Sequence, residues 1–423
     1  MSNDLIKKNY HIIIYIICYL SLLLGFFLGE NTTSGPKMDF NHAWNGAMEF
    51  NENIFFTLLN FDKIENLTRI SPIYLIVISL INKVLNSFEL TRLFLFFLIT
   101  LCQLFLYKIL KKIYYPKKTS DKKILFFLSC IIFISPSFRT NTIWPESAMF
   151  GLIFFLIGIY YFFKYQSNSN QVNIFFNIFF VALSAYIRPS FAIFAIFFFI
   201  YFFMQTKDKK TVVNMILLNL ILALPALYYV FILDIHFFKQ GVKDIGLNFN
   251  YLNKASVIFT IIFFHTIPIL FYQKFFFDNL SIKNNLVLFL VTIIISFTFI
   301  NFFDYDLKMT GGGIFLHISN FILDNNFIFF LVIPFSVFFI LKLCNIDIKK
   351  NLLILALVIL SIPQYTIYHK YLDPLIIILS LTIFNFKIEK SFFTIKNINF
   401  MYGFYLIFYL VNFVNHYLLD TLY

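Results

Sequence analysis

Long apolar runs recur along the chain from residue 10 to residue 418, separated by polar stretches of at most about 40 residues. A helix needs about 20 mostly apolar residues to cross the roughly 30 Å hydrocarbon core of a bilayer. The pattern therefore predicts an all-α, polytopic membrane bundle of about thirteen transmembrane helices. The predicted spans are roughly 10–28, 90–110, 124–138, 146–163, 173–187, 189–205, 211–233, 257–273, 285–303, 326–343, 351–367, 372–386 and 398–418.

Two segments after the first run differ from simple crossings. In 39–59, apolar residues recur at helical spacing, which predicts an amphipathic helix on the outer membrane surface. These residues are Phe40, Ala43, Trp44, Ala47 and Met48. The run 71–85 is short, includes Pro72 and carries Lys83, so we expect a re-entrant or interfacial helix that stays on the outer side. No polar stretch is long enough for a soluble domain. We therefore predict one integral-membrane domain, 1–423, made of a first outer loop, 29–89, and the remaining bundle, 90–423.

Composition and charge refine the topology. Of the 423 residues, 60% are hydrophobic and 13% are charged, with a formal net charge of +12. The lysines gather in short loops and not on one soluble face, which indicates membrane orientation and excludes a nucleic-acid partner. The basic run 111–123 is predicted to be cytoplasmic, which places the N-terminus inside and the C-terminus outside. We expect a bacterial inner (plasma) membrane as the location. The four cysteines have no CxxC spacing, so neither disulfides nor a metal cluster is indicated.

Two acids stand at predicted membrane boundaries on the outer side. Asp39 opens the surface helix, and Glu146 follows Pro145 at the head of a crossing. Each acid has an ordinary structural explanation, because carboxylates favour the starts of helices. Both face the same surface, however, and this favours a shared catalytic role.

Positively charged residues are predicted on the same side. Arg188 interrupts an apolar stretch and precedes a proline, so the chain should break there and place the guanidinium at the outer mouth of the bundle. It is either an anion clamp or a snorkelling helix-end residue. A short outer turn near the C-terminus holds His369, Lys370 and Tyr371. With Arg69 and Arg139, these residues offer binding groups for a phosphate-linked substrate.

The order of short motifs resembles that of the GT-C superfamily of membrane glycosyltransferases, such as the dolichyl-phosphate-mannose mannosyltransferases. The resemblance covers nearly the whole chain and depends on the sequence and sidedness of degenerate motifs. The matching segments are Asp39, "ISPIYLIVISL" (70–80), "KILKKIYYPKK" (108–118), "SPSFRTNTIWPES" (135–147), "YIRPS" (186–190) and "HKYLDPLIIIL" (369–379).

The resemblance implies transfer of a sugar from a polyprenyl-phosphate donor to a glycan, lipid or protein acceptor. Asp39 would act as general base and Glu146 would orient the acceptor or assist it. Arg188 and Lys370 would stabilise the negative charge on the departing phosphate. The family often carries a second acid beside the first, where this chain has Phe40 and Asn41. A divalent cation is therefore left open as a cofactor.

Two other classes of protein remain open. A polysaccharide polymerase of the O-antigen or capsule type also combines many helices with catalytic outer loops, but usually has its large loop late in the chain. A flippase or transporter for lipid-linked sugars should carry ionisable residues inside the bundle and a repeat between its halves.

Overall fold

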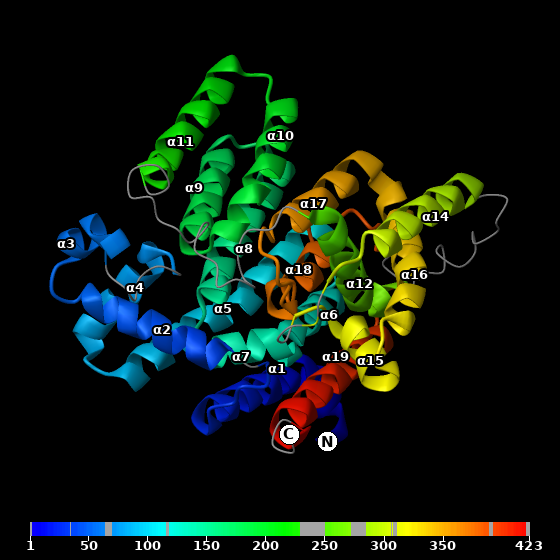
Figure 1. The fold of residues 1–423 in the computed structure, drawn as a ribbon. Helices are drawn as coiled ribbons and strands as arrows, with labels where there is room; N and C mark the ends of the chain where they lie inside the picture. The colour runs from blue at the N-terminus through cyan, green and yellow to red at the C-terminus, as the bar shows by residue number, and fades with distance from the viewer. Residues whose placement is uncertain are drawn as a thin grey trace. The chain divides into compact units, whose positions relative to one another are not determined.

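The structure is a computed structural model that describes residues 2–33, 35–63, 70–115, 118–228, 250–271, 285–305, 307, 311–388 and 392–419. Within these ranges every regular element is a helix (Figure 1). An isolated antiparallel bridge pairs Gly311 with Tyr368. The prediction of an all-α protein is confirmed.

The chain folds as two compact units, which are described separately. Unit 1 comprises Met1–Gly241 and Tyr409–Tyr423, and unit 2 comprises Val242–Phe408. The helices of unit 1 are α1 Ser2–Leu28, α2 Pro36–Glu49, α3 Ile54–Leu59, η1 Phe61–Lys63, α4 Pro72–Leu85, α5 Phe88–Tyr114, α6 Thr119–Ser129, η2 Cys130–Ile134, α7 Pro136–Ile143, α8 Ser147–Asn168, α9 Val172–Ile187, η3 Pro189–Phe194, α10 Ala195–Gln205 and α11 Lys209–Leu227.

Unit 2 is built mainly on α12, which packs against several of its other helices. The helices of this unit are α12 Tyr251–Leu270, α14 Leu286–Asn301, α15 Ile314–Leu323, α16 Phe327–Cys344, η7 Asn345–Asp347, α17 Ile348–Leu360, η8 His369–Tyr371, α18 Leu375–Leu381 and most of α19 Ile395–Val414. A π-helical turn, Asn415–Leu419, follows α19 and belongs to unit 1.

Seven helical stretches of the described chain are long and apolar enough to cross a membrane. They are Tyr10–Leu28, Phe88–Tyr114, Ser147–Asn168, Lys209–Leu227, Tyr251–Leu270, Phe327–Leu360 and Ile395–Tyr417. The pair Thr119–Ile134 and Pro136–Ile143 would make an eighth span, bent by 69°. The protein is therefore a helical membrane protein.

Other predicted crossings correspond to shorter helices. The apolar segments Val172–Ile187, Pro189–Gln205 and Leu286–Asn301 each have 10–17 residues. The predicted span 372–386 contains only the seven-residue α18. The predicted re-entrant segment 71–85 forms α4, which has 14 residues. At 1.5 Å per residue such a helix is roughly 21 Å long, which is less than the hydrocarbon thickness.

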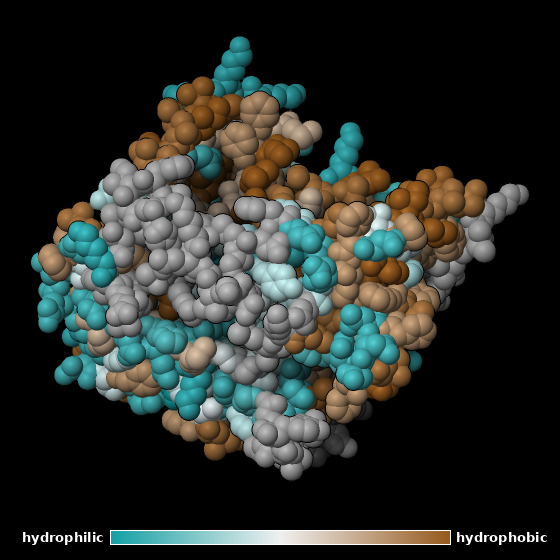
Figure 2. Space-filling view, in the orientation of Figure 1, coloured by the Kyte–Doolittle hydropathy of each residue, from teal (hydrophilic) through white to brown (hydrophobic). Residues whose placement is uncertain are grey.

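Large apolar side chains remain exposed on several of these helices, as expected for surfaces that face lipid. Figure 2 shows apolar residues over α11 and α14. Leu220, Ile221 and Leu224 of α11 are 58–60% exposed, and Phe297 of α14 is 70% exposed. Exposure of this extent would be costly in water but suits contact with acyl chains.

α8 and α9 form a closely packed hairpin in unit 1. Asn177 Nδ2 donates a hydrogen bond to the Gly158 carbonyl at 2.8 Å, and Ser184 Oγ donates to the Gly151 carbonyl at 2.8 Å. A Cβ atom on Gly158 would lie 2.8 Å from Val181 Cγ2, so this crossing requires glycine. Polar side chains thus join two helices whose other contacts are mainly apolar.

Candidate functional site

The segment 39–59 forms two helices, where the apolar pattern predicts one continuous helix. α2 ends at Glu49, and α3 begins at Ile54 after Asn53, whose side chain caps it. Gly35 takes a left-handed φ of +79° and Pro36 occupies the first turn, which is a favoured way to begin a helix.

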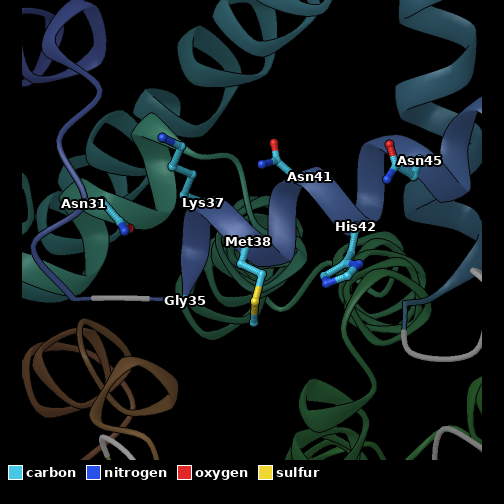
Figure 3. Close-up of a pocket in the computed structure, with 7 residues that line it drawn as sticks. All are labelled: Asn31, Gly35, Lys37, Met38, Asn41, His42 and Asn45. Carbon is cyan, nitrogen blue, oxygen red and sulfur yellow. The ribbon is translucent and has the colours of Figure 1, made fainter.

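The predicted apolar face of α2 is confirmed. Phe40, Ala43 and Ala47 are at most 2% exposed, and α2 packs against α4. The opposite face is polar and borders a hollow of about 390 Å³. The residues around this hollow are Asn31, Gly35, Lys37, Met38, Asn41, His42 and Asn45. Lys37, Asn41 and Asn45 point to one side of the helix, whereas Met38 and His42 point to another (Figure 3).

Asp39 lies within the first turn of α2 and is half-buried. The helix begins at Pro36, so the interpretation of Asp39 as its N-cap is wrong. Asp39 and His42 are three residues apart and therefore neighbours on the helix surface. This places a carboxylate at the border of the polar face.

Trp144 joins the start of α2 to the turn that precedes α8. Its indole Nε1 donates a hydrogen bond to the Glu30 carbonyl at 3.1 Å. Lys37 Nζ lies 5.2 Å from the Trp144 ring centroid, and Arg92 Cζ lies 4.3 Å from it. The two cations Lys37 and Arg92 thus lie against the same aromatic ring.

Arg139 belongs to α7 and forms a buried ion pair with Glu30. Its Nη2 lies 2.6 Å from Oε2 and its Nε 2.9 Å from Oε1, so the pair is bidentate. Arg139 also donates to Ser21 Oγ at 3.0 Å. Arg139 is 4% exposed and Glu30 is 7% exposed. The guanidinium, predicted to bind substrate, therefore holds the end of α1 against α7.

Glu146 and Arg188 are each linked to the start of α4, the "SPIY" segment. Tyr74 donates a hydrogen bond to the carbonyl of Pro145, next to Glu146. Burial raises the pKa of the Tyr74 phenol, and the Glu146 carboxylate acts in the same direction. Ser71 donates to the carbonyl of Tyr186, two residues before Arg188. The segment "ISPIY" is thus hydrogen-bonded to the backbone next to Glu146 and to the backbone two residues before Arg188.

The break at Arg188 is confirmed. α9 ends at Ile187, and Arg188 has an extended backbone before η3. Its side chain is half-buried, and a Cβ on Gly151 would lie 3.2 Å from Arg188 Cβ. Glu146 occupies the N-cap position of α8, five residues before Gly151. Glu146 and Gly151, the residue beside Arg188, therefore both lie at the start of α8.

The remaining predicted residues lie elsewhere. His369, Lys370 and Tyr371 form η8 in unit 2, and the Lys370 ammonium lies 5.7 Å from the Tyr368 ring centroid. Arg69 falls outside the described residues. Among the residues that the structure describes, no group of three His, Cys, Asp or Glu side chains could hold a metal ion.

Sequence reasoning missed Glu30, Arg92 and the amides of the α2 face. Glu30 could have been suspected, because a carboxylate that directly follows an apolar run needs a partner near the membrane. Arg92 gave no such signal, since it stands four residues after the N-terminus of α5 and resembles an ordinary helix-end cation.

Fold and site together define a helical membrane protein with a polar, aromatic and cationic cluster in unit 1. Comparisons with protein-family models, curated proteins and solved structures found no match.

Proposed function

We propose that this chain is a membrane glycosyltransferase that moves a sugar from a polyprenyl-phosphate donor to an acceptor on the outer side of a bacterial inner membrane. The observation that supports the proposal is the contact between α2 and the Trp144–Glu146 turn, made by Lys37 and the Trp144 ring. It brings the helix of Asp39 to the motif of Glu146, as the resemblance implies.

The hollow beside α2 has the chemistry of a sugar site. Asn31, Asn41 and Asn45 offer amides that both donate and accept, and His42 adds an imidazole. Asn31 Oδ1 is buried and makes no hydrogen bond within the described chain. An unmade buried hydrogen bond costs about 1–3 kcal/mol, which a hydroxyl-rich ligand would offset.

The cations supply the complementary charge for a phosphate. Arg92 is 6% exposed, and its Nη1 has no hydrogen-bond partner among the described residues. Its contacts include Glu89 at 2.8 Å, the Phe26 carbonyl, to which Nη2 donates at 3.5 Å, and the rings of Phe26 and Trp144. Lys37 lies at the same tryptophan. With Arg188, these groups would stabilise charge on a departing phosphate.

Asp39 and Glu146 have different roles in the proposed reaction. Asp39 takes the proton of the acceptor hydroxyl as that oxygen attacks the anomeric carbon, while the bond from this carbon to the phosphate oxygen breaks. Glu146 orients the acceptor. The hypothesis also assigns substrate binding to His369, Lys370 and Tyr371. It leaves a divalent cation open as a cofactor.

The proposal includes thirteen crossings, with the N-terminus in the cytoplasm and α4 on the outer side. The supporting observation is the excess of Lys and Arg in the loops that this topology places inside. The length of α4, which is too short to span, is in accord with it.

The transporter alternative keeps one supporting observation. His265 and Tyr405 are at most 1% exposed in unit 2, and such intramembrane polar groups are typical of transport pathways. Transfer of label to an acceptor would separate the two functions, because a transporter moves its lipid-linked sugar unchanged.

The test is sugar transfer by membranes that contain the full chain, supplied with labelled polyprenyl-phosphate hexoses and pentoses and with endogenous acceptors. Asp39→Asn should lower the rate by about 10²-fold or more, because an amide cannot act as the base. Asp208→Asn is the matched control, since Asp208 caps α11 and asparagine caps equally well. A fully active Asp39→Asn variant would move the base role to Glu146, and the absence of any transfer by the wild type would refute the proposal.

A further inference from the structure

Unit 2 contains a chain of three hydrogen-bonding side chains, of which His265 and Tyr405 have no role in the proposed transferase reaction. His369 Nε2 of η8 lies 3.0 Å from His265 Nε2 of α12. His265 Nδ1 lies 3.1 Å from the Tyr405 hydroxyl of α19. His265 and Tyr405 are 1% and 0% exposed, whereas His369 is half-buried.

The hydrogen bonds fix where the protons lie. The Tyr405 hydroxyl donates its single hydrogen to the His265 backbone carbonyl at 3.3 Å. The tyrosine oxygen is then the acceptor for His265 Nδ1–H, which leaves His265 Nε2 with a lone pair. His369 must consequently donate through Nε2–H. In the neutral state, the only basic nitrogen on His369 is Nδ1.

We propose that His369, His265 and Tyr405 form a proton-binding site that takes up one proton from water. The proton binds His369 Nδ1, and the imidazolium that forms keeps its Nε2–H directed at the lone pair of His265 Nε2. The positive charge is shared across the two rings. A second proton would have to take that lone pair, and two N–H groups would then face each other.

Tyr405 ends the hydrogen-bonded chain, so a proton cannot pass beyond it. Tyr405 ends on a backbone carbonyl, which does not take up a proton. A proton that enters at His369 therefore leaves by the same end. Because Tyr405 holds Nδ1–H of His265, it keeps the neighbouring Nε2 available as the acceptor, and it is a positioning residue.

Other charged and titratable groups set the pH range of the site. Burial lowers the pKa of His369 from its usual value near 6.5, and His317 acts in the same direction. Asp373, which is fully buried, lies close enough to Tyr405 to interact with it electrostatically. The Lys370 ammonium lies over the rings of Tyr368 and Tyr371. The pair should therefore be neutral at pH 7 and should bind its proton only as the pH falls toward the lowered pKa of His369, about 3.

Aromatic rings surround the two imidazoles, and His265 is shielded from bulk solvent. The Phe264 ring is 5.3 Å from His265 and 6.1 Å from His369, and the Phe408 ring is 5.2 Å from His369. In this apolar setting the hydrogen bond between the two rings is stronger than it would be in water.

The test is ¹⁵N NMR of the full chain in lipid nanodiscs, with ¹⁵N-labelled histidine. The chain has seven histidines, so single substitutions can assign the signals. At pH 7.5 we expect a scalar coupling between the Nε2 atoms of His265 and His369, with His265 as the Nδ1–H tautomer. On acidification both rings should shift together at one midpoint, with uptake of one proton.

Two variants separate the proton site from mere packing. Tyr405→Phe keeps the ring but removes the acceptor of His265 Nδ1–H, so the fixed tautomer and the shared midpoint should both be lost. His42→Gln removes an exposed histidine of unit 1 and should leave the coupling and the midpoint unchanged. Separate midpoints in the wild type, Nε2–H on His265, or signals that change when Zn²⁺ is removed by a chelator would each overturn the proposal.

Discussion

Loss of one partner from the buried ion pair between Glu30 and Arg139 should strongly destabilise unit 1. The perturbation that tests this is Glu30→Gln, which keeps the size of the side chain and removes its charge. Glutamine would also turn an amide N–H₂ toward the guanidinium, so that donor faces donor.

The magnitude follows from the contacts. Glutamine keeps one acceptor oxygen, so the substitution removes one of two charge-assisted hydrogen bonds, of 2.6 Å and 2.9 Å, each worth about 1.5–3 kcal/mol. The bonds of Arg139 to Ser21 remain, but its buried charge has lost its counterion. Breaking a buried pair in this way costs about 3–5 kcal/mol, and we expect the free energy of unfolding to fall by that amount.

The measurement is equilibrium unfolding in mixed micelles with increasing SDS, followed by tryptophan fluorescence. The chain has two tryptophans, and Trp144 itself bonds to the Glu30 carbonyl. A Trp44→Phe background therefore isolates a reporter at the site. Far-UV circular dichroism of the same samples reports loss of helix.

Two further variants make the result decisive. Glu89→Gln is the comparison, because Glu89 pairs with Arg92 from a side chain that is 64% exposed, so solvent screens its charge and its loss should cost less. Glu30→Gln combined with Arg139→Met removes both charges and should be more stable than Glu30→Gln alone. The reasoning fails if Glu30→Gln costs no more than Glu89→Gln.

Two other predictions concern helix packing and capping. Gly25→Ala should destabilise unit 1, since its Cβ would lie 2.4 Å from Glu30 Oε2. Gly403→Ala is the control, because its Cβ would have no neighbour within 4 Å. In the same SDS titration the control should leave the free energy of unfolding unchanged or raise it by up to about 1 kcal/mol. Hydrogen bonds from Thr211 and the backbone lower the pKa of Asp208, so its cap is present above pH 4 and is lost as the pH falls through the lowered pKa. Amide exchange in the first turn of α11 should then rise on acidification, and Asp208→Ala, but not Asp208→Asn, should show that rise at pH 7; equal exchange in both variants would refute the capping role.

Much of the helix pattern could be predicted because apolar periodicity and helix-end residues are local signals. The apolar face of α2 and the break at Arg188 and Pro189 are examples. The separation of α3 from α2 was missed, because Asn53 acts as a cap only once the chain turns at Phe50.

The partners of the site residues could not be predicted, because they are set by tertiary contacts. Arg139 is bonded to Glu30, 109 residues away in the sequence, and His265 meets His369 across 104 residues. A single sequence shows that a buried charge needs a partner, but not which one. The links from Ser71 and Tyr74 to two backbone carbonyls were equally invisible, since any residue supplies a carbonyl.

The hairpin of α8 and α9 has a consequence for how the chain enters the membrane during synthesis. Asn177 and Ser184 of α9 bond to carbonyls of α8 and not to each other. An isolated α9 in lipid would expose both polar side chains to hydrocarbon, where an unbonded amide or hydroxyl is costly. α9 should therefore leave the translocation machinery already paired with the helix made just before it. The sixteen residues of α9 are too few to hold it across the bilayer alone, so the preceding helix serves as its guide during insertion.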